Sequence, residues 1–127
     1  MSQTLAFEGI GQVSVTVKDV ERATAFYRDV LGLRLLFAFP GMAFFDCGGV
    51  RLYLTRAESP EFERSSVLYY RVSAIEETAR VLRDRGVAFT RDPHRLHADE
   101  RHELWMAFFK DTEDNTLALM SEKPITR

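Results

Sequence analysis

The sequence contains one structural unit twice, and this repeat limits the possible folds more than any other feature. "VSVTVKDVERATAFYRDVLGL" covers residues 13–33, and "LYYRVSAIEETARVLRDRGV" covers residues 68–87. Each copy begins as an alternating apolar strand, continues as an amphipathic helix and ends near a glycine. The glycines lie 15 residues after Val17 in the first copy and 14 residues after Val72 in the second. Such a repeat indicates two similar modules in one chain.

Further strands are predicted after each helix. Gly48-Gly49 forms a tight hairpin turn between two apolar runs of the first half. In the second half, the polar segment 91–102 holds Pro93 and is interpreted as a loop. The predicted strands that follow the helices are 33–39, 42–46, 50–55, 87–90, 103–110 and 116–120.

The repeat and the strands together define a fold class. One helix covers one face of a four-stranded sheet, and the other face stays open. Two such modules bury their open faces best around a shared space. We therefore predict an α+β fold of two tandem β-α-β-β-β modules whose curved mixed sheets enclose a cleft. The 127 residues form a single domain, with module one at about 9–56, a charged connection at about 57–65 and module two at about 66–122.

Composition excludes several classes of partner. The net charge is −2 and no basic block is present, so we expect neither nucleic acid nor a membrane surface as a partner. No apolar run approaches the about 18 residues of a membrane span, and the first nine residues lack the pattern of a signal peptide. The single cysteine, Cys47, excludes an internal disulfide. We therefore expect a cytoplasmic protein.

Three segments carry a resemblance to a known family: "VKDVERATAFYRDVLGL", "FFDCGGVRLYL" and "FFKDTEDNTLALM". From about Ile10 to Met120 the chain resembles the vicinal oxygen chelate superfamily, which includes glyoxalase I, bleomycin resistance proteins and extradiol dioxygenases. The resemblance implies the paired-module fold, a small-molecule ligand and a homodimer. Because this fold hosts many chemistries, the resemblance alone leaves the function open.

Enzymes of this family hold a divalent metal with four cleft residues, usually histidine or glutamate. The resemblance places the first at Gln12, seven residues before the helix-capping Asp19, and the second at Tyr53. It places the third at Val67 and the fourth at Ala118, neither of which has a donor atom in its side chain. Catalytic metal sites generally need about three protein ligands. We therefore expect no metal and no other cofactor.

Alternation along the strands predicts which side chains face the cleft. Val13 and Val15 must lie under the first helix, so Gln12 and Ser14 point away from it. The resulting lining of rings and polar groups suits a planar organic ligand that stacks on an aromatic side chain. The alternative is that these rings fill the cleft as core, with no ligand. The expected ligand-binding residues are Gln12, Ser14, Arg51, Tyr53, Val67, Tyr69, Trp105 and Ala118.

The segment "HRLHADERHE" supplies the candidates for catalysis. Its three histidines match no named metal motif. As a lid over the cleft, it would bring His97 or His102 to a ligand, and Glu103 at the mouth would act as a base if partly desolvated. The alternative is that Glu103 is a surface carboxylate paired with Arg95 or Arg101.

These observations support one leading hypothesis and two rivals. The leading hypothesis is a metal-independent protein that binds or sequesters a small, partly aromatic molecule, similar to the drug-sequestering members of the family. The first rival is a lyase, isomerase or dioxygenase, either metal-dependent with atypical ligands or metal-free using Glu103 or a loop histidine. The second is a structural or regulatory dimer without a ligand. The sequence leaves open whether the protein is an enzyme.

Overall fold

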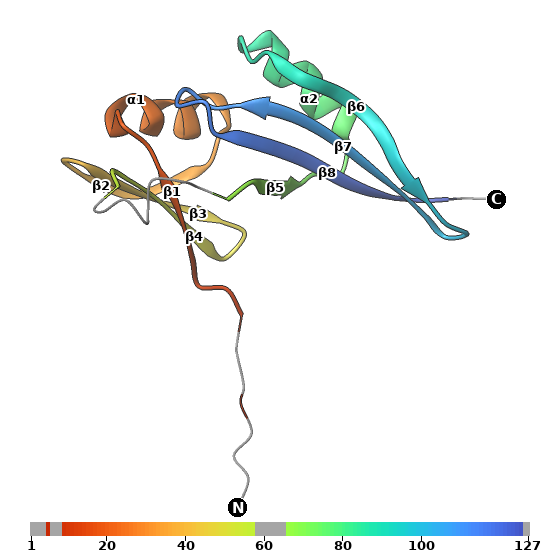
Figure 1. Cartoon of the computed structure of the whole chain (residues 1–127), viewed down its shortest axis with the longest axis horizontal. Helices are drawn as coiled ribbons and strands as arrows, with labels where there is room; N and C mark the ends of the chain where they lie inside the picture. Colours follow the sequence, from red (N-terminus) through yellow and green to blue (C-terminus); the bar gives the residue numbers. More distant parts are fainter. Residues whose placement is uncertain (1–4, 6–8, 58–65, 126–127) are drawn as a thin grey trace, which may run out of the picture.

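The computed structural model describes residues 5, 9–57 and 66–125, so most of the predicted connection lies outside the described residues. Two four-stranded mixed sheets form, each with a helix on one face. Both helices lie on the same side of the molecule, above the sheets (Figure 1). The predicted α+β class with two tandem modules is confirmed.

The two sheets have the same topology. In each, the first strand pairs in parallel with the last, and the remaining neighbours are antiparallel. Gly48 and Gly49 both have positive φ, which confirms the predicted hairpin turn. The first sheet has the order β1-β4-β3-β2, with β1 at Gln12–Thr16, β2 at Arg34–Phe39, β3 at Met42–Cys47 and β4 at Val50–Thr55. The second has the order β5-β8-β7-β6, with β5 at Leu68–Arg71, β6 at Phe89–Ala98, β7 at His102–Lys110 and β8 at Thr116–Pro124.

The two helices differ in regularity. Helix α1 (Val20–Ala25) begins at Asp19, whose carboxylate accepts a hydrogen bond from a backbone amide of the first turn. It continues as a π-helical turn, η1 (Phe26–Val30), and not as the uniform α-helix that the apolar stripe predicts. Helix α2 (Ile75–Asp84) is regular and lacks a side-chain cap. No helix in the described part of the chain is long and apolar enough to cross a membrane.

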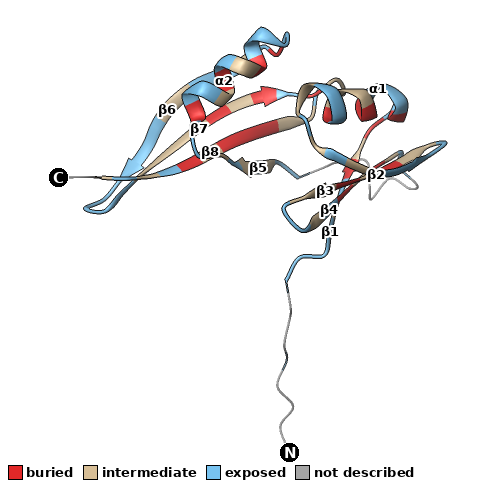
Figure 2. Cartoon of the chain, turned by 180° about the vertical axis from the view of Figure 1, so that it is seen from behind, coloured by how far each residue is buried: buried red, intermediate tan, exposed pale blue. Residues whose placement is uncertain are grey.

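The hydrophobic core is continuous between the modules. Alternate residues of the central strands point toward the helices, and the buried stretches of the strands lie beneath them (Figure 2). The largest fully buried side chains come from both halves: Tyr27, Phe45 and Leu54 from the first, and Ile75, Phe109 and Leu117 from the second.

A polar junction joins the modules. The hydroxyl of Tyr27 donates a 2.7 Å hydrogen bond to Asp111, in the turn between β7 and β8, and both residues are buried. The carboxylate of Glu113, in the same turn, accepts from the backbone amides of Lys18 at 2.7 Å and Asp19 at 3.0 Å. The last hairpin therefore holds the start of the first helix.

The predicted polar loop at 91–102 is wrong, because most of it belongs to strand β6, which pairs with β7. The strand is irregular, and its register shifts between Arg91 and His94, where Pro93 lies. Proline removes a ladder donor and is tolerated at such bulges on an edge strand. Most side chains of this strand are exposed, so the polar sequence carries no alternating signal. The expected lid is therefore an arm of the second sheet.

Candidate functional site

A row of aromatic rings crosses the open face of the first sheet, away from α1. Successive ring centroids are 5.7 Å apart for Phe39 and Phe37, 4.7 Å for Phe37 and Phe44, and 4.5 Å for Phe44 and Tyr53. The last two rings are nearly parallel, with 8° between their planes. Register places Phe44 opposite Tyr53, while their chain neighbours point into the core. We call these four residues the aromatic row.

A positive group lies beside the aromatic row. Gln12 and Arg51 are partners in the β1–β4 ladder, and the Nε of Arg51 donates a 2.8 Å hydrogen bond to the Oε1 of Gln12. The guanidinium carbon lies 5.4 Å from the ring centroid of Phe44. Ser14 pairs with Tyr53 in the same ladder. The structure thus brings together on one face the four residues of module one that the sequence analysis expects to bind a ligand: Gln12, Ser14, Arg51 and Tyr53.

The open face of the second sheet holds a smaller aromatic group. Tyr69 and Phe108 both flank Ala118 in the ladders, and their rings meet edge-on at 6.2 Å. Ala118 is completely buried beneath them. Val67 precedes β5 and is exposed. The ring of His94 lies 6.5 Å from Phe108, and its Nε2 is buried without a hydrogen-bond partner among the described residues.

The predicted placement of Trp105 in the cleft is wrong. Trp105 pairs with Ser121 in the ladder, one position out of phase with Phe108, and packs against the buried core on the side of α2. The Nζ of Lys123 lies 4.4 Å from the centre of the indole and also pairs with Glu76 of α2 at 2.9 Å. Both faces of β7 are apolar, so alternation alone does not decide which one faces the helix.

Glu103 lies on the same side as Trp105, and its placement at the mouth of the cleft is also wrong. Its Oε2 accepts a 3.0 Å hydrogen bond from the indole nitrogen of Trp105. Its other oxygen lies 3.6 Å from Arg95, as the surface-pair alternative expects. These two contacts hold the carboxylate away from the open face, so this geometry does not support a catalytic base at Glu103.

His97 and His102 reach the open face of the second sheet near its far end. Both are exposed, and both line a hollow of about 220 Å³. Its other walls include Asp99 and Glu122. The backbone amides of His102 and Arg101 donate to Asp99 and hold the pKa of that carboxyl below its usual value. Within the described residues, no three histidine, cysteine, aspartate or glutamate side chains gather to hold a metal.

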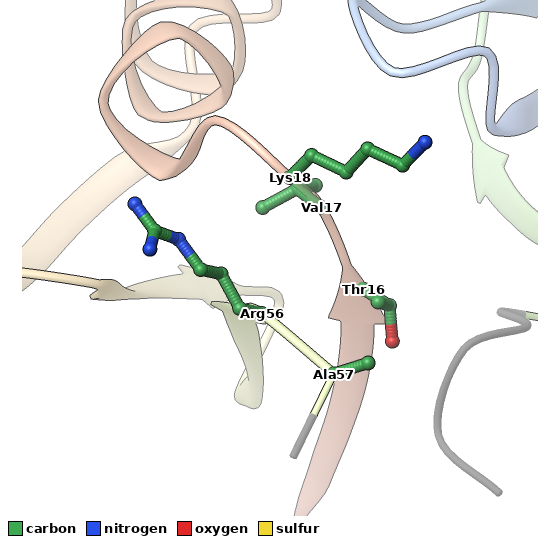
Figure 3. A pocket seen from close by; sticks show the side chains of 5 residues that line it. All are labelled: Thr16, Val17, Lys18, Arg56 and Ala57. Carbon is green, nitrogen blue, oxygen red and sulfur yellow. The ribbon is translucent and has the colours of Figure 1, made fainter. Parts of the chain in front are cut away.

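Two larger hollows lie elsewhere. One, of about 570 Å³, is lined by residues 16–18, 56 and 57 at the ends of β1 and β4. Figure 3 shows Lys18 and Arg56 extending in opposite directions, so these two cations do not converge on a common point. The other, of about 560 Å³, lies between β4 and β5. Tyr69 of the second open face lines this hollow, but no residue of the aromatic row lines either one. Phe37 is 43% and Tyr69 is 49% exposed. Within one chain, these open faces do not cover each other.

The residues at the four family metal positions do not suit a metal ion. Val67 and Ala118 have no donor atom, and the amide oxygen of Gln12 is engaged by Arg51. Tyr53 is stacked on Phe44. Catalytic zinc sites use three protein ligands drawn from histidine, carboxylate and thiolate, and none of these groups is present here.

Comparison with known proteins agrees with this architecture. The sequence model of the Glyoxalase/Bleomycin resistance protein/Dioxygenase superfamily matches residues 9–119. The chain belongs to this superfamily. A search of curated proteins by sequence gives no match.

Several solved structures share the fold. The antibiotic binding protein TnmS3 from Streptomyces sp. CB03234 is 25% identical, with a TM-score of 0.75 over 93% of this chain and 98% of that one. A glyoxalase/bleomycin resistance protein/dioxygenase from Nocardioides is 22% identical, with a TM-score of 0.75 over 98% and 92%. Lactoylglutathione lyase from Agrobacterium tumefaciens is 20% identical, with a TM-score of 0.71 over 90% and 93%.

Proposed function

We propose that the protein binds or sequesters a small, partly aromatic molecule without a metal ion. The observation that carries this proposal is the stacked pair of Phe44 and Tyr53 with the guanidinium of Arg51 beside it. Flat rings stack on such a surface, and aromatic contacts of this kind contribute about 0.5–1.5 kcal/mol beyond their buried area. Arg51 remains exposed, so it is available to an acidic or carbonyl group of the ligand.

We further propose that the binding protein is a homodimer in which a second copy closes the site. Phe37 and Phe39 of the aromatic row are exposed in a single chain, as is Tyr69 on the second sheet. Large exposed apolar patches mark interaction surfaces. In a two-fold pair, the first sheet of one protomer would face the second sheet of its partner, so that each ligand touches both. For this pairing we propose modules at about 9–56 and 66–122.

Two further observations support the proposal. TnmS3, which has the same fold and 25% identity, is an antibiotic binding protein. The four residues at the family metal positions include two without a donor atom, which favours binding over metal-dependent catalysis.

The free thiol of Cys47 supports a cytoplasmic location, where thiols remain reduced.

Calorimetric titration with 2-naphthoate tests this function, because the compound offers a flat ring system and one carboxylate. We expect binding that is unchanged by EDTA. Tyr53→Ala should weaken it by about 1–3 kcal/mol, as expected for an anchoring ring. Tyr53→Phe is the matched control, since it keeps the ring, and it should bind as the wild type does. Light scattering should give the mass of a dimer.

Other outcomes would favour the rivals. Binding that appears only after addition of Zn²⁺ or Mn²⁺ would support a metal-dependent lyase, isomerase or dioxygenase with atypical ligands. Turnover of a substrate that is lost in His102→Ala would support a metal-free enzyme. A dimer that binds no member of a broad set of planar aromatic compounds would support the structural or regulatory reading.

A further inference from the structure

A second hollow of about 560 Å³ lies between the modules, apart from the aromatic row. Its walls include Val13 and Leu52, which point to the helix side of the first sheet, and Leu68 and Tyr70 of β5. Cys47, at the end of β3, also contributes to the lining. The hollow falls within the range of volumes, about 300–1,000 Å³, that hold small molecules in proteins.

The polar side chains that line this hollow include Tyr69, Tyr70 and Arg71, and Tyr69 and Arg71 are exposed. The hydroxyl of Tyr70 is buried and has no hydrogen-bond partner among the described residues. A buried hydroxyl without a partner is costly, and such groups in native proteins call for a missing partner. Burial raises the pKa of Tyr70 far above its ordinary value, and Cys47 and Asp111 raise it further. The hydroxyl therefore keeps its proton and is a hydrogen-bond donor without an acceptor among the described residues.

We propose that this hollow is a second binding site, which takes a mainly apolar molecule with one carbonyl-type acceptor that accepts a hydrogen bond from the hydroxyl of Tyr70. The aliphatic side chains of Val13, Leu52 and Leu68 favour an apolar body for this molecule. Buried hydroxyl donors discriminate strongly against analogues that lack the acceptor, because the donor is then left unpaired. This site does not depend on the aromatic row, since its walls include the opposite face of the first sheet.

Cys47 provides a reporter for occupancy, because it is the only cysteine of the chain and it lines the hollow. Burial raises the pKa of its thiol, and Asp46 raises it further. Alkylation by iodoacetamide is therefore slow at neutral pH and should be followed in alkaline buffer, where the thiolate is populated. A molecule in the hollow shields the thiol and slows this reaction.

The experiment compares acetophenone, which has a carbonyl, with ethylbenzene, which has nearly the same shape without one. We expect acetophenone to protect Cys47 at a concentration about 5-fold lower, the factor that one net hydrogen bond of about 1 kcal/mol gives. In Tyr70→Phe, the two compounds should protect equally. The variant should unfold at the same or a higher temperature, because it loses only a hydroxyl without a partner.

Tyr53→Ala is the matched control for the aromatic row, and it should leave the protection of Cys47 unchanged. A failure of 2-naphthoate binding would thus leave this inference standing. Protection of Cys47 by neither compound would overturn the proposal and indicate that water is the hydrogen-bond partner of the Tyr70 hydroxyl. Equal protection by both compounds in the wild type, or a carbonyl preference that survives in Tyr70→Phe, would also overturn it.

Discussion

The open faces of the two sheets occupy equivalent positions in the repeat but distribute their bulk differently. In the first sheet, the row from the edge strand inward is Ser14, Tyr53 and Phe44. In the second sheet, the equivalent row is Tyr69, Ala118 and Phe108. In the first sheet the tyrosine lies on the inner strand β4 and the small serine on the edge strand β1. In the second sheet the tyrosine lies on the edge strand β5 and the small alanine on the inner strand β8. The aromatic surface is therefore continuous on the first sheet, whereas on the second sheet Ala118 interrupts it.

This difference also concerns position 118, which is one of the four family metal positions. The rings of Tyr69 and Phe108 meet above Ala118, which is 0% exposed. A glutamate at position 118, as family enzymes have, would need the space that these rings occupy. The space above Ala118 is thus filled by the contact between the two rings. A ligand group at this position must approach from above the rings.

The modules differ again beneath their helices, and this comparison leads to the largest expected effect. Tyr27 lies eight residues after the capping Asp19, and Leu82 lies eight residues after Ala74. One copy thus uses a phenol where the other uses an aliphatic side chain. Burial raises the pKa of Tyr27 far above its ordinary value, and Asp111 raises it further, so the hydroxyl stays a donor.

We expect Asp111→Ala to lower the free energy of unfolding by about 3–4 kcal/mol. Asp111 is 7% exposed and accepts hydrogen bonds from Tyr27, from the amides of Glu113 and Asn115, and from the Asn115 side chain. Urea unfolding measures the loss. In a double-mutant cycle, Tyr27→Phe should show a coupling of about 1–2 kcal/mol with Asp111→Ala. Strictly additive losses would show that the junction does not couple the modules.

The second prediction places one substitution at two equivalent positions. Ala118→Glu should cost about 2–3 kcal/mol, because it forces Tyr69 and Phe108 apart and buries a carboxylate. Tyr53→Glu, at the half-exposed equivalent position, should cost about 1 kcal/mol, mainly through the lost stacking on Phe44. Thermal unfolding of both variants measures the difference. Equal costs would mean that the two faces are packed alike.

The smallest effect concerns Lys123, which lies over Trp105 and pairs with Glu76 in module two alone. Lys123→Ala should cost about 0.5–1 kcal/mol, a modest figure because Glu76 is largely exposed. Lys123 holds the pKa of Glu76 below the ordinary 4.5. Stability from a lowered carboxyl pKa is present above the ordinary pKa and is lost as pH falls through the folded one. The difference in the free energy of unfolding between wild type and variant should therefore become smaller as the pH drops below about 4.5. An unchanged difference at pH 2 would contradict the ion pair.

The repeat allowed the fold to be predicted because alternation and helical spacing are strong signals where one face is buried. Strand β4 has its predicted bounds of 50–55, and Gln12 and Arg51 share a face as expected. The aromatic row was only partly foreseen. Strand β2 has a register shift between Leu35 and Phe37, and this bulge turns Phe37 toward Phe44. A bulge leaves no mark in an apolar sequence.

The second sheet was harder to predict for two physical reasons. Strand β7 is apolar on both faces, so the choice between Trp105 and Phe108 depends on pairing with β8, which sequence periodicity does not contain. Strand β6 is mostly exposed, so its polar composition resembles that of a loop. His94 was visible only as one histidine of three, and its position against Phe108 follows from the same pairing.

The bond between Tyr27 and Asp111 also has a consequence for the order of events during synthesis. Its partners are 84 residues apart, and ribosomes add about 5–20 residues/s, so roughly 4–17 s separate their appearance. Throughout that interval the first helix carries a phenol that still lacks its acceptor. Module one therefore completes its packing only when the last hairpin emerges, and the nascent chain matures as one cooperative unit and not as two successive halves.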